Sequence, residues 1–181
     1  VVQRARAISE GRFTFLNQEV SYKNGIEWND PGVSQLWRYH LHYFGYVEDL
    51  ILLSMAGEPE RAWRTFQSLA SSWIFGNGFL RGDGWHPYTV ALRIVNWLNG
   101  LAYWKERLAE APEFRGRFLS SLYGQARFLA GNLEKDVRGN HLLENVRALL
   151  WAGVAFSGKE ASGWRQTALG LLRTELVEQV L

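Results

Sequence analysis

The chain has 181 residues, of which 47% are apolar and 21% charged, a composition typical of a folded domain and not of a disordered segment. It contains no cysteine, which excludes disulfides, thiolate metal sites and a cysteine nucleophile. The formal net charge is +2 without any Lys/Arg-rich run, and no apolar run approaches a membrane span, so neither nucleic acid nor a bilayer is an expected partner.

The two ends of the sequence suggest a piece of a longer protein. The chain starts at Val1, its only methionine is Met55, and the last residues before Leu181 still follow a helical pattern. We expect a periplasmic or secreted location, although the lack of cysteine does not identify the compartment.

Aromatic residues make up 14% of the chain, which fits either a sugar-binding groove or a large helical core.

Residues 1–33 are predicted to form a lead-in, helical at first. Residues 13–17 alternate like a short strand, and residues 20–23 precede a turn signal at Asn24 and Gly25. We therefore expect a small β-hairpin near residues 12–27.

From residue 34 onward the apolar pattern is helical, so residues 34–181 are predicted to be all-α. The expected helices cover residues 34–56, 59–75, 87–108, 112–135, 141–157 and 160–181. Pro59, Pro87 and Pro112 each stand where a helix would begin. Short links between successive helices predict helical hairpins, and three of these suggest an α/α toroid or a solenoid arc.

Two longer connections, residues 76–86 and 135–140, contain polar side chains able to contact a ligand. Loops held on a rigid scaffold often carry function. Site residues are therefore expected at and beside these two loops.

The first long helix places Tyr39, His42, Tyr43 and Tyr46 at positions i, i+3, i+4 and i+7, so they would share one face. Such a face could stack on sugar rings and bind their hydroxyl groups. Alternatively, the rings pack against a neighbouring helix while their polar tips reach solvent.

In the helix that begins at Pro87, a polar stripe of Thr89, Arg93 and Asn96 runs beside an apolar one. Arg93 could bind a carboxylate or sulfate through two hydrogen bonds. The alternative is an ordinary surface salt bridge.

The third candidate site is the start of the helix near residue 141. Asn140 stands at the N-cap position, and His141 would lie in the first turn, where free N–H groups attract anions. His141 and Glu144 are spaced i, i+3 and could interact. Four histidines without cysteine give no zinc ligand set, and no phosphate loop or nucleophile elbow is present, so we expect no metal or cofactor.

Several blocks together resemble the N-terminal region of heparinase II/III-like proteins. In family order they are residues 15–17 (FLN), 36–44 (LWRYHLHYF), 85–88 (WHPY), 92–97 (LRIVNW) and 139–145 (GNHLLEN). The resemblance extends over residues 13–181. His40 is a departure, because the family pattern leads us to expect asparagine there.

The resemblance implies an incomplete α/α toroid, followed in the full-length protein by a β-sandwich domain, with the substrate cleft between them. It further implies cleavage of uronic-acid polysaccharides by β-elimination, with Asn140 neutralising the carboxylate and His141 assisting. The family's tyrosine acid/base and a further histidine would lie downstream of Leu181, so residues 1–181 alone are expected to be inactive. The residues expected to contact substrate are Trp37, Tyr39, His42, Tyr43, His86, Tyr88, Arg93, Asn96 and Glu144.

Two other functions stay open at this point. A non-catalytic glycan-binding or scaffold module could use the same toroid. A hydrolase would need two carboxylic acids flanking the scissile bond, for which only Asp83 and Glu144 lie near the loops.

The absence of a Lys/Arg cluster in the loops favours a uronate polymer with few or no sulfate groups.

Overall fold

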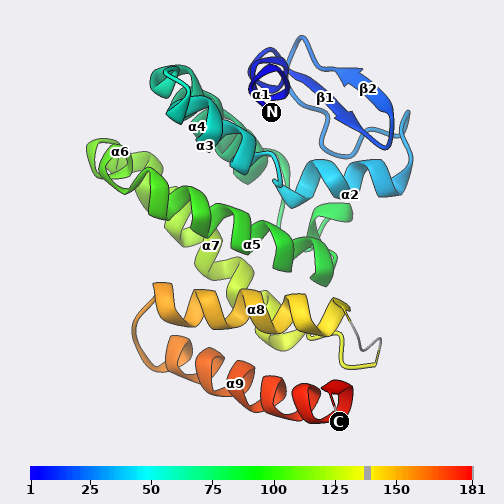
Figure 1. Cartoon of the computed structure of the whole chain (residues 1–181), viewed down its shortest axis with the longest axis vertical. Coiled ribbons are helices and arrows are strands. Elements are labelled where there is room, and N and C mark those ends of the chain that lie inside the picture. The colour runs from blue at the N-terminus through cyan, green and yellow to red at the C-terminus, as the bar shows by residue number, and fades with distance from the viewer. Residues whose placement is uncertain (137–139, 181) are drawn as a thin grey trace.

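The molecule is a stack of helical hairpins with a small β-hairpin near its N-terminal end (Figure 1). A computed structural model describes residues 1–136 and 140–180, with side chains through Glu175. Within this part of the chain, the predicted all-α fold with a short N-terminal β-hairpin is confirmed.

The N-terminal segment forms helix α1 (Val2–Ser9) and the strands β1 (Arg12–Phe15) and β2 (Gln18–Ser21), which pair antiparallel. Phe15 pairs with Gln18, so the turn consists of Leu16 and Asn17. Their φ angles of 53° and 60° are those of a two-residue turn that matches the twist of the strands. The hairpin therefore turns earlier than Asn24 and Gly25, where the sequence carries its turn signal.

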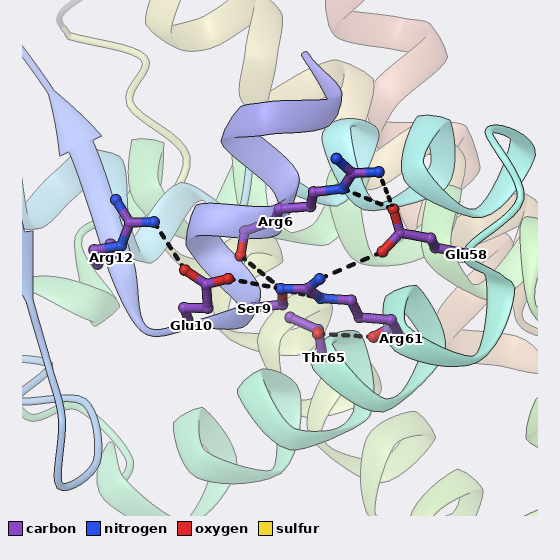
Figure 2. Close-up of polar contacts among 7 residues, drawn as sticks. All are labelled: Arg6, Ser9, Glu10, Arg12, Glu58, Arg61 and Thr65. Carbon is purple, nitrogen blue, oxygen red and sulfur yellow. Dashed lines mark hydrogen bonds and ion pairs between the residues drawn. The ribbon is translucent and has the colours of Figure 1, made fainter.

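Side chains of α1 are tied to the helix α4 (Pro59–Gly76) by a surface network around Arg61 (Figure 2). Arg61 contacts Glu10 at 2.9 Å, and its Nε donates to the Ser9 hydroxyl at 2.6 Å. Glu58, just before α4, accepts from Arg6 at 2.7 Å. Arg6 and Glu10 are exposed and the other groups are half-buried, so each pair contributes little stability, while together they connect α1 to α4.

The predicted helix over residues 34–56 is wrong in one respect, because it is two helices, α2 (Gln35–Tyr43) and α3 (Val47–Met55). Ser34 caps α2 by accepting a hydrogen bond from the Trp37 N–H at 3.2 Å. Phe44 ends α2 in the left-handed conformation, with a φ of 59°. Its buried ring packs against Trp28 and Trp97, which holds this unusual backbone conformation in place.

The later helices follow the predicted order. After α4 and a short 3-10 turn, Asp83–Trp85, they are α5 (Pro87–Tyr103), α6 (Lys105–Glu110), α7 (Pro112–Gly131), α8 (Asn140–Ala155) and α9 (Lys159–Val180). Pro59, Pro87 and Pro112 each occupy the first helical positions, as predicted. The predicted helix 87–108 is interrupted at Trp104, and the predicted helix 112–135 ends at Gly131.

Figure 1 shows α3 and α4, then α5 with α7, then α8 with α9, following one another along the long axis. The last pair packs closely, since a Cβ on Gly153 would lie 2.8 Å from the Ala161 carbonyl oxygen. None of the helices in residues 1–136 and 140–180 is long and apolar enough to cross a membrane. Residues 137–139 of the second predicted loop, and Leu181 at the end of the last predicted helix, lie outside the described residues.

Most of the aromatic excess belongs to the core. Phe66 stacks on Trp104 with ring centroids 4.8 Å apart, and Trp97 stacks on Phe118 at the same separation. The tryptophans exposed by 6% or less are Trp28, Trp37, Trp63, Trp73, Trp97, Trp104 and Trp164. The high tryptophan content is therefore chiefly a packing feature, and the surface aromatic residues that remain are the ones to consider for a site.

Candidate functional site

A continuous series of five aromatic rings, which we name the aromatic row, lies across the ends of three helices. Four of the rings belong to α2, α5 and α8, and the fifth belongs to the residue that precedes α5. Each ring contacts the next, in the order His86, Tyr39, Tyr43, Tyr88 and His141. The centroid separations along the row are 5.4, 6.4, 5.9 and 4.2 Å. His86 is exposed and the other four are half-buried, so the row presents ring faces and edges at the surface.

The row is assembled by the ends of three helices. Tyr39 and Tyr43 lie one turn apart near the end of α2, while Tyr88 follows Pro87 in the first turn of α5. His141 is the second residue of α8. In Figure 1, α2 and the starts of α5 and α8 all lie on the right-hand side of the view. Segments separated by about a hundred positions in the sequence thus meet at one edge of the stack.

The tyrosines of the row are neutral hydroxyl donors. Burial raises the pKa of Tyr43 to about 12, and the neighbouring Tyr88 adds to the shift. Burial also raises the pKa of Tyr39 and of Tyr88, the latter with a further contribution from Glu144. At neutral pH these side chains can donate hydrogen bonds to sugar oxygens, but none of them is prepared to act as a base.

His141 is held from two directions. Its ring stacks on Tyr88 with an interplanar angle of 25°, and its Nδ1 lies 3.0 Å from Oε1 of Glu134. The second oxygen of Glu134 accepts a hydrogen bond from Asn145 Nδ2 at 3.0 Å. The Glu134 side chain is only 10% exposed, whereas that of His141 is 40% exposed, so the carboxylate lies behind the imidazole.

Asn140 is the first residue of α8 and is exposed, directly beside His141. It therefore lies at the start of the helix, within one residue of the predicted N-cap position. The first turn of a helix carries N–H groups without intrahelical partners and the positive end of the helix dipole. An anion approaching Asn140 would meet favourable electrostatics from the backbone as well as from the side-chain amide.

Arg93 is not placed to contact a substrate, which corrects the prediction that it binds a carboxylate or sulfate. The side chain is fully buried and donates to the carbonyl oxygens of His42 at 3.2 Å and Gly84 at 2.8 Å, and to Gln125 Oε1 at 2.8 Å. Its guanidinium also lies 3.8 Å from the centre of the Trp73 ring. Because the side chain is fully buried, the guanidinium is not accessible to a substrate at the surface.

His42 is also fully buried, and its Nδ1 accepts a hydrogen bond from Trp73 Nε1 at 2.9 Å. Burial, and then the nearby charge of Arg93, lower the pKa of His42 to about 3, so the ring is neutral. Gly84 packs directly on this ring, where a Cβ would lie 2.9 Å from His42 Nδ1. We name Arg93, His42, Trp73, Gly84 and Gln125 the Arg93 cluster. It holds α2, α4, α5, α7 and the 3-10 turn together.

The predicted face of Tyr39, His42, Tyr43 and Tyr46 is therefore divided by the structure. Tyr39 and Tyr43 join the aromatic row, while His42 points into the Arg93 cluster. Tyr46 follows the break at Phe44 and is buried, with its hydroxyl donating to the Leu41 carbonyl at 3.1 Å. A helix that ends at Tyr43 cannot carry Tyr46 on the same face.

The other predicted contact residues have structural partners. Trp37 is fully buried and donates from Nε1 to the Gln18 carbonyl at 3.1 Å, so it joins α2 to the β-hairpin and cannot stack on a sugar. Asn96 donates to the Tyr43 carbonyl at 2.8 Å. Glu144 pairs with Arg147 at 3.2 Å, and His141 contacts Glu134 in its place.

The hydrolase alternative gains no support from these positions. Asp83 binds Arg38 at 2.6 Å and Gln35 at 3.0 Å, on the side of α2 that faces the loop over residues 29–33. Burial alone would raise the pKa of Asp83, but the hydrogen bonds from Gln35 and Arg38 lower it, so the carboxyl group stays ionised. An ionised, doubly bound carboxylate is unsuited to act as a general acid.

The sequence singles out neither Glu134, which contacts His141, nor Asn145, which donates a hydrogen bond to Glu134. The sequence pattern predicts a helix through residue 135, whereas α7 ends at Gly131 and Glu134 lies beyond it. The available signal was the i, i+4 spacing of His141 and Asn145, which places both side chains on the same face at the start of α8.

The chain belongs to the heparinase II/III family, because the model of the heparinase II/III N-terminus matches residues 3–181. It is 28% identical over 172 residues to a heparin-sulfate lyase of Pedobacter heparinus, a match that covers 88% of this chain and 25% of that protein. A heparin-sulfate lyase of Bacteroides stercoris is 28% identical over 112 residues, or 58% of this chain and 16% of that protein. The chain thus spans a quarter or less of these curated relatives.

Solved structures confirm the architecture. The crystal structure of heparan sulfate lyase HepC from Pedobacter heparinus matches 98% of this chain and 29% of that protein, with a TM-score of 0.87 and 26% sequence identity. A heparinase III structure also has a TM-score of 0.87, at 20% identity, over 98% of this chain and 31% of that one. The fold is therefore the expected incomplete α/α toroid.

Proposed function

We propose that the protein is a polysaccharide lyase that cleaves a uronic-acid polymer by β-elimination, outside the cell or in the periplasm. In this proposal the helical domain supplies the residue that neutralises the substrate carboxylate and part of the surface that binds the sugar chain. Membership of the family and the lyase relatives support the class of reaction. The position of Asn140 beside the aromatic row carries the assignment of this site.

The reaction makes one demand that this site is suited to meet. The proton on C5 of a uronate is weakly acidic, because an adjacent anionic carboxylate resists further negative charge. An enzyme must hydrogen-bond that carboxylate so that the enolate-like intermediate is stabilised. Asn140 presents an exposed amide at the first turn of α8, where the helix dipole also favours negative charge.

The aromatic row would bind the sugar chain beside Asn140. Tyr88 and His141 are in ring contact next to it, and Tyr43, Tyr39 and His86 continue the surface away from it. Sugar rings have apolar faces and hydroxyl edges, so neutral tyrosines can stack on the former and donate to the latter. The row would thus orient several sugar units of the chain, including the unit whose carboxylate binds Asn140.

The acid and base of the elimination are not assigned to residues of this chain. The pKa of each row tyrosine is raised, so at neutral pH the phenol stays protonated and cannot accept the C5 proton. This agrees with the family resemblance, by which the acid/base tyrosine lies downstream of Leu181. We therefore expect residues 1–181 to bind uronate oligosaccharides without cleaving them.

The names of the two relatives make heparan-type polymers the first substrates to test. Polymers without sulfate come next, because the loops at this edge of the chain show no cluster of Lys and Arg. The test is the ultraviolet absorbance of newly formed unsaturated uronates, measured with the full-length protein on heparan sulfate, heparin, alginate and other glucuronans.

Asn140→Ala tests the role of the site in the same assay. Loss of one preorganised hydrogen bond to a developing oxyanion should lower kcat by about a hundredfold to a thousandfold. Asn99→Ala, an exposed asparagine on α5 outside the aromatic row, is the matched control and should retain activity. Full activity in Asn140→Ala would refute the assignment. Binding without elimination on every polymer would favour a non-catalytic glycan-binding module instead.

A further inference from the structure

The contact between Glu134 and His141 determines which imidazole nitrogen carries the proton. An ionised carboxylate can only accept hydrogen bonds. Glu134 Oε2 accepts from Asn145 Nδ2 at 3.0 Å, and Oε1 lies 3.0 Å from His141 Nδ1. If Nδ1 carried no proton, two acceptors would face each other at this distance, so the proton must lie on Nδ1.

Glu134 itself is held in place by a pair of hydrogen bonds to Asn145. The Glu134 backbone N–H donates to Asn145 Oδ1 at 2.9 Å, while Asn145 Nδ2 donates to the carboxylate. Asn145 is fully buried and the Glu134 side chain is 10% exposed, so this closed pair is largely shielded from water. Glu134, three residues after the end of α7, is thereby fixed to α8, with its carboxylate directed at His141.

The remaining freedom of the imidazole is removed by Tyr88. The Tyr88 and His141 ring centroids lie 4.2 Å apart, so stacking on Tyr88 fixes the plane of the imidazole. The contact of Nδ1 with Glu134 fixes the rotation of the imidazole within that plane. Among the described residues, no hydrogen bond reaches His141 Nε2. The side chain is 40% exposed, which leaves this nitrogen available to a ligand.

We infer that Glu134 is a positioning residue that fixes His141 in the Nδ1–H tautomer, so that Nε2 accepts a hydrogen bond from a hydroxyl group of the bound sugar. Asn140 and His141 then bind different groups of one sugar unit, the amide donating to the carboxylate and the imidazole accepting from a hydroxyl. The part played toward substrate rests on the proposed function, whereas the tautomer does not.

The tautomer can be measured directly from the ¹⁵N shifts of the histidine rings, recorded at alkaline pH where imidazoles are neutral. The chain has four histidines, and His141→Asn identifies the relevant signals. We expect a protonated Nδ1 and an unprotonated Nε2 for His141. An Nε2–H tautomer in the unaltered chain would overturn the inference, whether or not any variant folds.

Glu134→Gln then reverses the hydrogen bond without changing the shape of the side chain. Its amide oxygen can still accept from Asn145, while its NH₂ group donates to His141 Nδ1 and moves the ring proton to Nε2. Glu144→Gln removes a charge one turn along the same helix and should leave the Nδ1–H tautomer in place. An unchanged tautomer in Glu134→Gln would also overturn the inference.

In the full-length lyase, Glu134→Gln should lower kcat/KM by about 10- to 100-fold, as is usual when a supporting hydrogen bond to a site residue is lost. Glu113→Gln, an exposed carboxylate on α7, should not. A reversed tautomer with unchanged turnover would refute the role of Nε2 toward substrate. If the full-length protein cleaves no polymer, the proposed function fails, while the ring spectra still decide the tautomer.

Discussion

His42 and His141 are both bound through Nδ1, but their partners impose opposite protonation on that atom. In the Arg93 cluster, the Trp73 indole donates to His42 Nδ1, which must therefore be unprotonated. In the aromatic row, Glu134 accepts from His141 Nδ1, which must be protonated. The first histidine is fully buried and neutral, and the second is 40% exposed.

The comparison shows that residue type alone does not separate a structural site from a binding site. The Arg93 cluster contains a histidine, with Trp73 packed on the guanidinium of Arg93. The aromatic row likewise contains a histidine, with Tyr88 stacked on it. They differ in where the polar groups end. In the Arg93 cluster they bind backbone and side-chain acceptors inside the protein, whereas the residues of the aromatic row are exposed or half-buried.

The largest effect that would test this contrast is expected from Arg93→Ala. Removing the guanidinium leaves the His42 and Gly84 carbonyls and Gln125 without their donor and opens a cavity beside Trp73. We expect the free energy of unfolding to fall by about 3–5 kcal/mol, measured by urea denaturation.

Arg115→Ala is the matched control, because Arg115 is exposed on α7. Its free energy of unfolding should change by no more than about 0.5 kcal/mol. Equal, small effects of the two substitutions would contradict a structural role for Arg93 and return it to the set of possible substrate contacts.

The next effect is a pH dependence of stability arising from His42. Burial lowers its pKa from the ordinary 6.5 to about 3, so between these values the unfolded chain binds a proton that the folded chain does not. The free energy of unfolding should therefore fall as the pH decreases through this window, by up to about 1.4 kcal/mol per pH unit from this group. Above the ordinary pKa the contribution is constant.

Urea denaturation at a series of pH values, with His42→Asn beside the unaltered chain, isolates this contribution. Asparagine can still accept from Trp73, but it does not titrate, so the variant should lose this part of the slope. His86→Asn, which removes an exposed histidine of the aromatic row, should keep it. Identical slopes for all three chains would show that His42 is protonated in the folded state.

The smallest effect concerns the aromatic row. Tyr88→Leu removes the ring that stacks on His141, and it should weaken binding of a uronate oligosaccharide by about two- to tenfold in calorimetry. Tyr88→Phe keeps the ring but loses the hydroxyl group, so its affinity should lie between those of Tyr88→Leu and the unaltered chain. Tyr103→Leu, an exposed tyrosine near the other end of α5, should bind like the unaltered chain. If Tyr88→Leu binds equally well, the row is not the binding surface.

The order of helices and their proline starts were predictable because they depend on local rules. The break at Phe44 was not, since nothing in a phenylalanine signals a left-handed backbone, which here is imposed by packing on Trp28 and Trp97. The burial of Arg93 was not predictable either. Its partners come from α2, the turn before α5, and α7, so only the tertiary structure brings them together.

The residues of the candidate site likewise fall into those that the sequence predicts and those that only the tertiary structure brings together. Asn140, His141, Tyr88 and the α2 tyrosines were found because they lie in short motifs next to helix ends. Glu134 was not, because its contact with His141 depends on where α7 ends and on tertiary contacts between residues that follow α7 and the start of α8.

The end of α2 has a consequence for engineering. Its carbonyls at His42 and Tyr43 are bound by Arg93 and Asn96, which lie three residues apart on α5. These two hydrogen bonds fix the orientation of α2 relative to α5, and a rotation of one helix against the other would break both of them. A designer who transplants the α2 tyrosines into another scaffold should move Arg93 and Asn96 with them, because the angle of the graft is set by α5.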